Sequence, residues 1–299
     1  DRADIAKVHH LLAVTNSALG DYFGAAASEQ LALVLTRAIG GDPVNEATLL
    51  GNLGTMYRVI GDGGRALATV REALDLAMRI GDRERIAFAR DSLAGLYLTR
   101  GELATALALH RQTLVDLEGL KFPLVEGNAR LNLGITLYRL GDDAAALDTW
   151  ADGERICTAS HDDGCLISIL ASRGDLHRDR GRLDAAEADY RRGLMLAQDG
   201  QRAREIAYLQ RGLGLCAMAR GEHDEARVLL ERAVAAFRRV RAGEEIVALL
   251  ALGDLEQKVG RVAEARSQYE HGLSLAQAQA EHGSEVVALA SLARLDFDA

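Results

Sequence analysis

The apolar residues of this chain recur with the spacing of amphipathic helices, and each helical stretch ends at a glycine. One such stripe consists of Leu50, Leu53, Gly54, Tyr57 and Ile60, and this spacing places them on one helical face. Gly61 follows the stripe, and glycine tolerates the left-handed conformation that ends a helix. The next residue, Asp62, can cap a second helix. The pattern therefore predicts a unit of helix, tight turn and helix.

The glycines that end these stretches are about 40 residues apart. They are Gly20, Gly61, Gly101, Gly141, Gly181, Gly221 and Gly260. An alanine stands five positions after each of them, and a glycine or alanine stands seven positions before. Small residues that face each other let two helices approach closely. The repetition predicts a solenoid in which each repeat packs mainly against its neighbours.

We expect a single all-α, right-handed solenoid over residues 1–299 with seven repeats and one further helix. The expected repeats span about 4–41, 44–81, 84–121, 124–161, 164–201, 204–241 and 244–281, and the terminal helix spans about 284–297. The chain begins at Asp1 inside a helical pattern and ends after only the first helix of an eighth repeat. We therefore expect it to be a module of a larger protein.

Two stretches of the sequence carry a family motif. Leu50-Gly51-Asn52-Leu53-Gly54 is followed by Tyr57 and Gly61-Asp62, and Leu131-Asn132-Leu133-Gly134 is followed by Gly141-Asp142. With the recurring alanine, these runs resemble tetratricopeptide repeats, although the usual period of that family is about 34 residues. The 40-residue variety is similar to repeats of bacterial transcriptional regulators with a nucleotide-binding switch, of peptide-pheromone receptors and of cargo or polarity adaptors. The resemblance implies an all-α solenoid that binds proteins or peptides.

The fifth repeat departs from the pattern. Arg173 stands where the other repeats have leucine, and His177 also takes an apolar position, as Glu256 does in the seventh repeat. We interpret the charges of the fifth repeat as local i, i+4 contacts, with Arg173 bent toward solvent. The alternative is a charged hinge or docking spot that lets the solenoid flex.

Composition and charge exclude several function classes. The net charge is −9 and there is no basic block, which argues against direct nucleic-acid binding. No stretch has the apolar length of a membrane helix. Three cysteines in a chain without a recognisable secretory signal favour a reducing compartment, so we expect a cytoplasmic protein. The abundance of arginine, alanine and glycine suggests a GC-rich bacterial genome.

Candidate chemistry is sparse. Cys157-x3-His161-x3-Cys165 has soft ligands, but zinc sites usually show Cys-x-x-Cys spacing and four ligands, so we interpret it as two packed cysteines beside a polar turn. Gly61-Asp62-Gly63-Gly64 lacks the strand and the Lys-Ser/Thr of a phosphate loop. The remaining histidines are not arranged with a serine or cysteine nucleophile. We therefore expect no catalytic residue, no metal and no cofactor.

The best candidate site is the face formed by the first helices of the repeats, which line the concave side of such solenoids. The predicted contact residues are Asn52, Arg58, Asn128, Asn132, Tyr138, Arg139, Arg178 and Arg211. Amides can bond the backbone of an extended peptide, arginines can pair with its carboxylates, and Tyr138 adds apolar area. By the family resemblance, Asn52 and Asn132 match groove asparagines best. An ordinary solvated helix face would be equally polar.

These observations favour a protein- or peptide-binding module without a catalytic role. The favoured context is the sensor or regulatory arm of a larger bacterial signalling or transcription regulator. The alternatives are a standalone adaptor for protein assembly and the targeting segment of an enzyme. The expected partner is a protein or peptide segment, or another domain of the same polypeptide. We expect no direct binding to nucleic acid or to a membrane.

Overall fold

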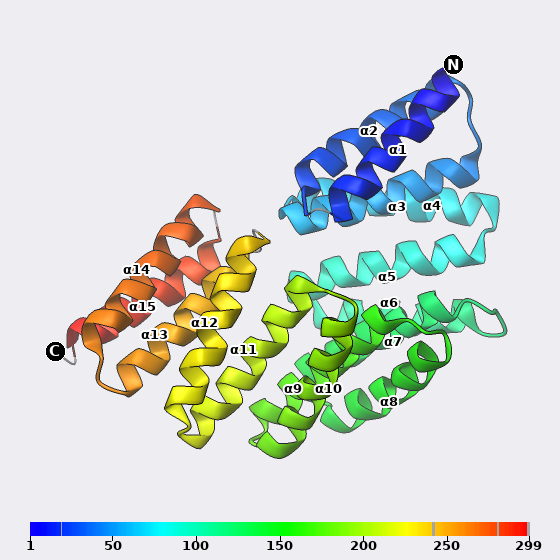
Figure 1. The fold of residues 1–299 in the computed structure, drawn as a ribbon. Coiled ribbons are helices and arrows are strands. Elements are labelled where there is room, and N and C mark those ends of the chain that lie inside the picture. Colours follow the sequence, from blue (N-terminus) through cyan, green and yellow to red (C-terminus); the bar gives the residue numbers. More distant parts are fainter. Residues whose placement is uncertain (19, 241–242, 280, 298–299) are drawn as a thin grey trace. The chain divides into compact units, whose positions relative to one another are not determined.

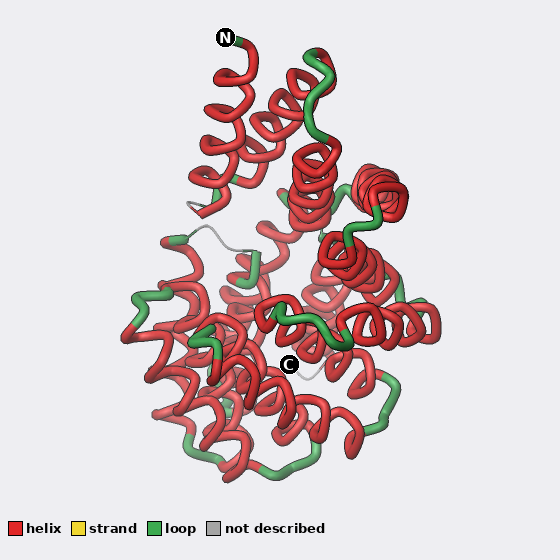
Figure 2. The backbone as a smooth tube through the Cα atoms, turned by 90° about the vertical axis from the view of Figure 1, so that its right-hand side faces the viewer, coloured by secondary structure: helices red, strands yellow, loops and turns green. Residues whose placement is uncertain are grey.

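The computed structural model describes residues 1–18, 20–240, 243–279 and 281–297, and all regular elements of these ranges are α-helices (Figures 1 and 2). They are α1 (Arg2–Ala18), α2 (Tyr22–Ala38), α3 (Pro43–Ile60), α4 (Gly63–Ile80), α5 (Arg83–Thr99), α6 (Leu103–Leu117), α7 (Pro123–Arg139), α8 (Asp143–Ala159), α9 (Asp163–Asp179), α10 (Leu183–Asp199), α11 (Ala203–Arg220), α12 (His223–Arg239), α13 (Glu245–Lys258), α14 (Val262–Ala278) and α15 (His282–Phe297). The all-α prediction is confirmed.

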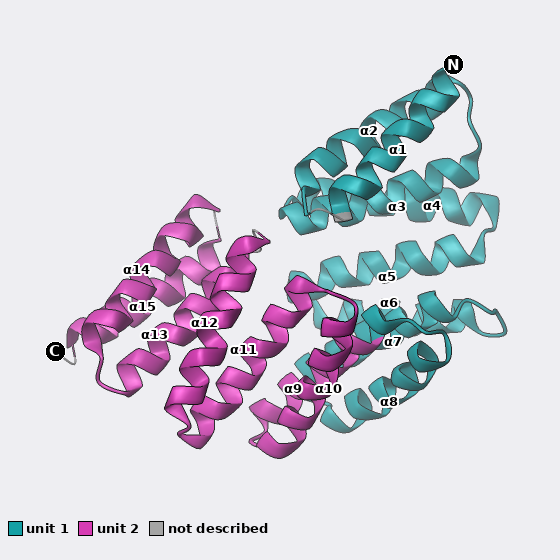
Figure 3. Ribbon diagram, in the orientation of Figure 1, with its two compact units in different colours: residues 1–165 teal, residues 166–299 magenta. Residues whose placement is uncertain are grey.

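The chain divides into two compact units, residues 1–165 and 166–299 (Figure 3). In the first unit α1, α3, α5 and α7 each pack against the helix that follows, and α3, α5 and α7 also contact one another in sequence. In the second unit α11 packs against α12 and α13 against α14, while α11, α13 and α15 contact one another in sequence. The expected organisation as one domain over residues 1–299 stays a prediction.

The turns follow from the repeating glycines. All seven have positive φ values, between 71° at Gly181 and 86° at Gly61, which is the left-handed conformation that favours glycine. The side chain of Asp62 then accepts a hydrogen bond from the backbone N–H of Arg65, at 2.9 Å. This bond caps α4 and lowers the pKa of Asp62 below its ordinary value. The predicted helix-turn-helix unit is therefore present, with an aspartate cap at α2, α4 and α8 and no side-chain cap at α6, α10, α12 and α14.

The small residue before each turn accommodates a large side chain of the second helix. A Cβ atom on Gly134 would overlap the indole of Trp150, and one on Gly174 would lie 2.6 Å from Tyr190 Cε1. Three other repeats show the same relation, in the pairs Gly54 and Val70, Gly214 and Leu230, and Gly253 and Tyr269. The recurring alanine is fully buried in every repeat. The sequence predicts that this alanine faces the small residue of the first helix. In the structure, the side chain that faces the glycine stands four positions after the alanine.

Candidate functional site

Three first helices of the first unit, α3, α5 and α7, lie next to one another (Figure 1). Residues 40 positions apart in these helices occupy matching places, and residues four or three apart share a helical face. We define the first-helix face of this unit by Thr48, Asn52, Thr55, Phe88, Ser92, Gly95, Asn128, Asn132 and Ile135. All nine are partly or largely exposed.

The aromatic residue of this face, Phe88, is not among the contact residues predicted from the sequence. Phe88 is 42% exposed, and it lies against α3, where a Cβ on Gly51 would be 3.0 Å from its Cε1 atom. Its matching residues in α3 and α7 are Thr48 and Asn128, both polar. The signal was available in the 40-residue spacing, because Phe88 is an apolar side chain between two polar ones at equivalent positions.

Asn52 and Asn132 both bond a carboxylate inside the first unit. Asn52 Nδ2 donates to Glu29 Oε1 at 2.9 Å, and His10 Nδ1 lies 3.0 Å from Glu29 Oε2. The Glu29 side chain is fully buried. Because a buried carboxylate needs donors, this asparagine stabilises the junction between α2 and α3.

Asn132 belongs to an equivalent set. Its Nδ2 atom donates to Asp91 Oδ2 at 2.7 Å, and Nδ1 of the fully buried His110 lies 2.8 Å from Asp91 Oδ1. Both sets occupy the same three positions of the repeat. His10 and Asp91 stand three positions before the small residue of a first helix, and Glu29 and His110 stand four positions after the alanine of the second helix. Asn52 and Asn132 stand two positions before the small residue of the next first helix. We call these sets, His10–Glu29–Asn52 and Asp91–His110–Asn132, the polar triads.

The other predicted residues of the first unit have exposed or half-buried side chains. Asn128 is exposed, and its Nδ2 donates to Leu124 O of its own helix at 2.8 Å. Arg139 is exposed, and one of its terminal nitrogens lies 3.4 Å from Leu98 O of α5. Arg58 is exposed, and the half-buried Tyr138 has its ring centroid 6.3 Å from that of Trp150. Their role as ligand contacts stays a prediction.

In the second unit, a polar cluster surrounds Asp175 of α9. Its carboxylate accepts hydrogen bonds from Tyr190 at 2.6 Å, from Arg178 at 2.7 Å and from Tyr208. Burial, together with the Asp175 charge, raises the pKa of Tyr190 and of Tyr208 well above the ordinary value. Both phenols therefore stay protonated and donate. The guanidinium of Arg211 lies over the Tyr208 ring, 4.9 Å from its centroid. The structure thus connects the two predicted arginines, Arg178 and Arg211, through Tyr208 and Asp175.

Arg173 is not bent toward solvent, so that interpretation is wrong. Its Nε and a terminal nitrogen bond the two carboxylate oxygens of Asp189, at 2.8 Å and 2.6 Å, and both side chains are mostly buried. Asp189 belongs to α10, so the pair joins two helices. Likewise, the buried Glu256 of α13 pairs with Arg227 of α12 at 2.6 Å. Arg173 of repeat five and Glu256 of repeat seven are therefore members of inter-helix ion pairs.

Comparison with known proteins agrees with this architecture. A family model described as tetratricopeptide repeat matches residues 45–114 and 205–278, and a second model with the same description matches residues 167–199. The chain belongs to the tetratricopeptide repeat family. A search of curated proteins finds no match to it. Tetratricopeptide repeats are protein interaction modules, so this chain is a protein-binding scaffold.

Several solved structures share the fold of this tetratricopeptide repeat chain. A Rap protein complexed with Competence and Sporulation Factor has a TM-score of 0.71 at 12% identity, covering 93% of this chain and 79% of that one. A signal transduction ATPase from Pyrococcus horikoshii with a tetratricopeptide repeat sensor has a TM-score of 0.68 at 12% identity, covering 91% and 42%. A tetratricopeptide repeat protein from Parabacteroides merdae has a TM-score of 0.59 at 17% identity, covering 96% and 99%. At these identities the likeness shows the fold alone.

The cysteines of this tetratricopeptide repeat chain correct a second expectation. Cys157 and Cys165 form a disulfide, whereas their spacing predicts two packed cysteines beside a polar turn. Disulfides are typical of oxidising compartments, so the cysteine content no longer supports a reducing one. In the described ranges, no group of three or more His, Cys, Asp or Glu residues is arranged to hold a metal ion. No helix in those ranges is long and apolar enough to span a membrane.

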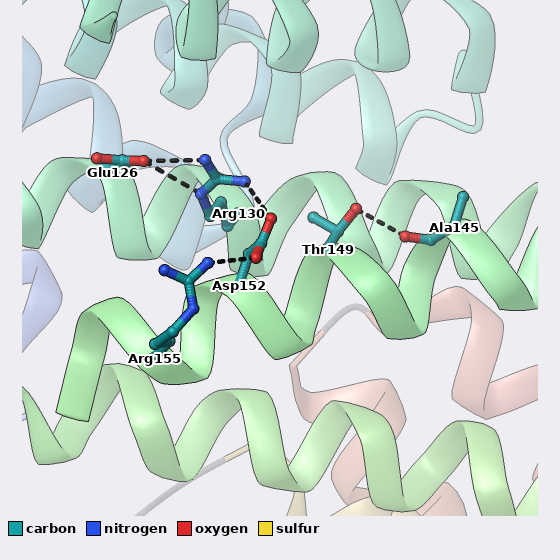
Figure 4. Close-up of polar contacts among 6 residues, drawn as sticks. All are labelled: Glu126, Arg130, Ala145, Thr149, Asp152 and Arg155. Carbon is teal, nitrogen blue, oxygen red and sulfur yellow. Dashed lines mark hydrogen bonds and ion pairs between the residues drawn. The ribbon is translucent and has the colours of Figure 1, made fainter. Parts of the chain in front are cut away.

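One further polar network of the tetratricopeptide repeats lies in repeat four. Arg130 of α7 bonds Glu126 of its own helix at 3.0 Å and Asp152 of α8 at 3.2 Å, and Asp152 also bonds Arg155 at 2.5 Å (Figure 4). These charges pair with one another across the two helices. We therefore assign the network to the stability of the repeat and not to ligand binding.

Proposed function

We propose that this chain is the sensor or regulatory arm of a larger bacterial signalling or transcription regulator, and that it binds an extended peptide or protein segment through its first helices. The observation that carries the proposal is the first-helix face of the first unit. There Phe88, an aromatic residue with 42% exposure, stands between the matching polar residues Thr48 and Asn128 of the neighbouring first helices, and the exposed Arg139 lies at the end of α7. Apolar anchors with polar neighbours are typical of peptide-binding surfaces.

The side chains of this face have distinct roles in the proposal. Phe88 contributes apolar contact area. The Nδ2 atoms of Asn52 and Asn132 are engaged by carboxylates, while their Oδ1 atoms have no donor among the described residues and accept backbone N–H groups of the ligand. Arg139 pairs with a ligand carboxylate. Asn128 exchanges its bond within its own helix for one to the ligand backbone.

Two of the solved structures with this fold support the regulatory context. The Rap protein is complexed with a factor for competence and sporulation, and the ATPase from Pyrococcus horikoshii carries its tetratricopeptide repeats as a sensor. A nucleotide-binding loop or a helix-turn-helix encoded beside this segment agrees with the proposed context. An adjoining catalytic domain without either would contradict it.

The binding face is tested with substitutions that leave the triads intact. A segment captured from a bacterial lysate by the immobilised chain is identified by mass spectrometry and synthesised. We expect Phe88→Ala, Asn128→Ala and Arg139→Ala each to weaken its binding about tenfold, or roughly 1.4 kcal/mol. Arg111→Ala, at an exposed position of α6, is the matched control. If the control loses affinity and the three variants do not, the face is wrongly assigned.

A further inference from the structure

The disulfide of the first unit occupies two positions at which the other repeats have no cysteine. Cys157 stands eleven positions after the buried alanine of its second helix, and Cys165 stands nine positions before the small residue of the next first helix. At the junction of repeats two and three the same positions hold Ala77 and Arg85. Both cysteines are buried, and their bond joins the last turn of α8 to the first turn of α9. The bond is therefore an addition to the common repeat.

The turn between α8 and α9 is also closed by hydrogen bonds. The N–H of Asp162 donates to Cys157 O at 2.9 Å, and the N–H of Cys165 donates to the Asp162 carboxylate at 3.0 Å. The turn between α4 and α5 has the same two bonds around Asp82, at 3.2 Å and 3.0 Å, and it contains no cysteine. Because hydrogen bonds alone hold that turn, we expect the fold to survive loss of the bond between the sulfurs.

Gly127 of α7 makes room for both sulfur atoms. A Cβ atom on Gly127 would lie 2.7 Å from Cys157 Sγ and 3.1 Å from Cys165 Sγ. In the other six repeats the matching residue is larger. These residues are Ala6, Ala47, Ala87, Ile167, Ala207 and Ile246. Two separate thiols need not occupy this space, since each Cβ–Sγ group can rotate into another rotamer. The space beside Gly127 is thus shaped for the bonded pair.

The bond is buried, so a reductant reaches it through a local opening. Cys165 is the third residue of α9, after Asp163 and Gly164. The first turn of a helix has few internal hydrogen bonds and opens at lower cost than the core. Glycine in that turn weakens it further. Opening of this turn exposes Cys165 Sγ while the rest of α8 and α9 stays helical.

We propose that Cys157 and Cys165 form a redox-sensitive switch of the α8–α9 turn, which the disulfide holds closed and the dithiol form lets open more readily. The reductant is a dithiol. Its thiolate attacks Cys165 Sγ, the bond between the two sulfurs breaks, and Cys157 leaves as a thiolate that takes up a proton. The second thiol of the reductant then attacks the mixed disulfide and releases Cys165, which is protonated in turn. The reductant becomes a disulfide, so two electrons and two protons pass to the protein.

The redox reaction is tested on the whole folded chain with dithiothreitol as the reagent. The chain is equilibrated in mixtures of reduced and oxidised dithiothreitol from both directions, and its free thiols are alkylated and counted by mass spectrometry. Cys216 is a free thiol, so we expect one alkyl group in the oxidised chain and three in the reduced chain. Both directions should give the same ratio, with unchanged circular dichroism. Three alkyl groups in the oxidised chain, or reduction only in denaturant, would overturn the proposal.

Hydrogen exchange measures the opening of the turn. We expect reduction to speed the exchange of the Asp162 and Cys165 amides about tenfold, and to leave the Asp82 and Arg85 amides of the α4–α5 turn unchanged. The double variant Cys157→Ala with Cys165→Ala should exchange at the rate of the reduced chain, with or without dithiothreitol. Equal exchange in the oxidised and reduced chain would show that the bond does not control the turn.

A substitution on α7 tests the fit of the bonded pair. Gly127→Ala introduces the residue of α1, α3, α5 and α11, and its methyl overlaps the bonded sulfurs. We expect it to shift the equilibrium about tenfold toward the dithiol. Gly95→Ala, whose Cβ meets no atom within 4 Å, is the control and should leave the equilibrium unchanged. No shift in Gly127→Ala would contradict the assignment of this space to the disulfide. None of these measurements uses a peptide, so their failure leaves the proposed function intact.

Discussion

The glycines of the first helices differ in what surrounds them, although most look alike in the sequence. Gly134 and Gly174 each face a fully buried aromatic ring of the second helix, whereas a Cβ on Gly95 would meet no atom within 4 Å. Gly95 follows Ala94, which is the true counterpart of Gly134 in the repeat. One kind of glycine is required by packing, and the other leaves open space on the first-helix face.

This difference predicts opposite effects for the same substitution. Gly134→Ala should lower the free energy of unfolding by roughly 1–3 kcal/mol, because the added methyl overlaps the Trp150 indole. It would also disturb the 3.1 Å bond from Trp150 Nε1 to Leu131 O. Gly95→Ala should be neutral or stabilising by up to about 1 kcal/mol, from the higher helix propensity of alanine. Denaturant unfolding measures both. Equal effects at the two sites would refute this account of the packing.

At the scale of helices, the structure replaces part of an apolar interface with a charge pair in repeat five. Arg173 of α9 and Asp189 of α10 occupy positions that hold leucine in repeat six, at Leu213 and Leu229. The pair satisfies its own charges with two bonds. Replacing both charged residues of such a buried pair by apolar ones lowers the stability less than replacing one, because a single replacement leaves the other charge unpaired.

Removal of the arginine alone should therefore destabilise the chain. We expect Arg173→Leu to lower the free energy of unfolding by roughly 1–3 kcal/mol, since Asp189 keeps its charge in a mostly buried place. The double variant Arg173→Leu with Asp189→Leu should recover most of this loss. Thermal or denaturant unfolding of the three proteins tests the pairing. A stabilising single substitution would instead mean that the arginine is merely tolerated.

The helices were predictable from the sequence because each is specified by local signals. At the starts of α2, α4 and α8 the left-handed glycine, a capping aspartate and the apolar stripe lie within a few residues of one another. At α6, α10, α12 and α14 the glycine and the stripe act without a side-chain cap. The polar contacts between helices could not be predicted, because the partners are far apart in the chain. Asp91 and Asn132 are 41 residues apart, and Arg173 and Asp189 are 16 residues apart. A single polar residue on a helix does not reveal its partner on another. Alignment of the repeats by position provides that information.

At the scale of the whole molecule, the two units present different chemistry on equivalent helices. The first unit combines an exposed aromatic ring with amides that bond carboxylates of the same unit. The second unit holds tyrosines and arginines around Asp175. For both units we propose contact with one class of ligand, an extended segment with apolar and acidic side chains. The asparagines expected to bind it also stabilise the repeats, so their substitution reports on stability as well as on binding.

The central claim is that the first-helix face of the first unit binds the ligand, and Gly95 offers the most direct test. It lies in this face on α5, and its missing side chain leaves open space. Gly95→Leu therefore fills the face without entering the core. The measurement is the affinity of the captured segment for this variant, with melting temperature recorded in parallel. We predict at least a tenfold loss of affinity with an unchanged or higher melting temperature. Binding equal to that of the unmodified chain would contradict the account.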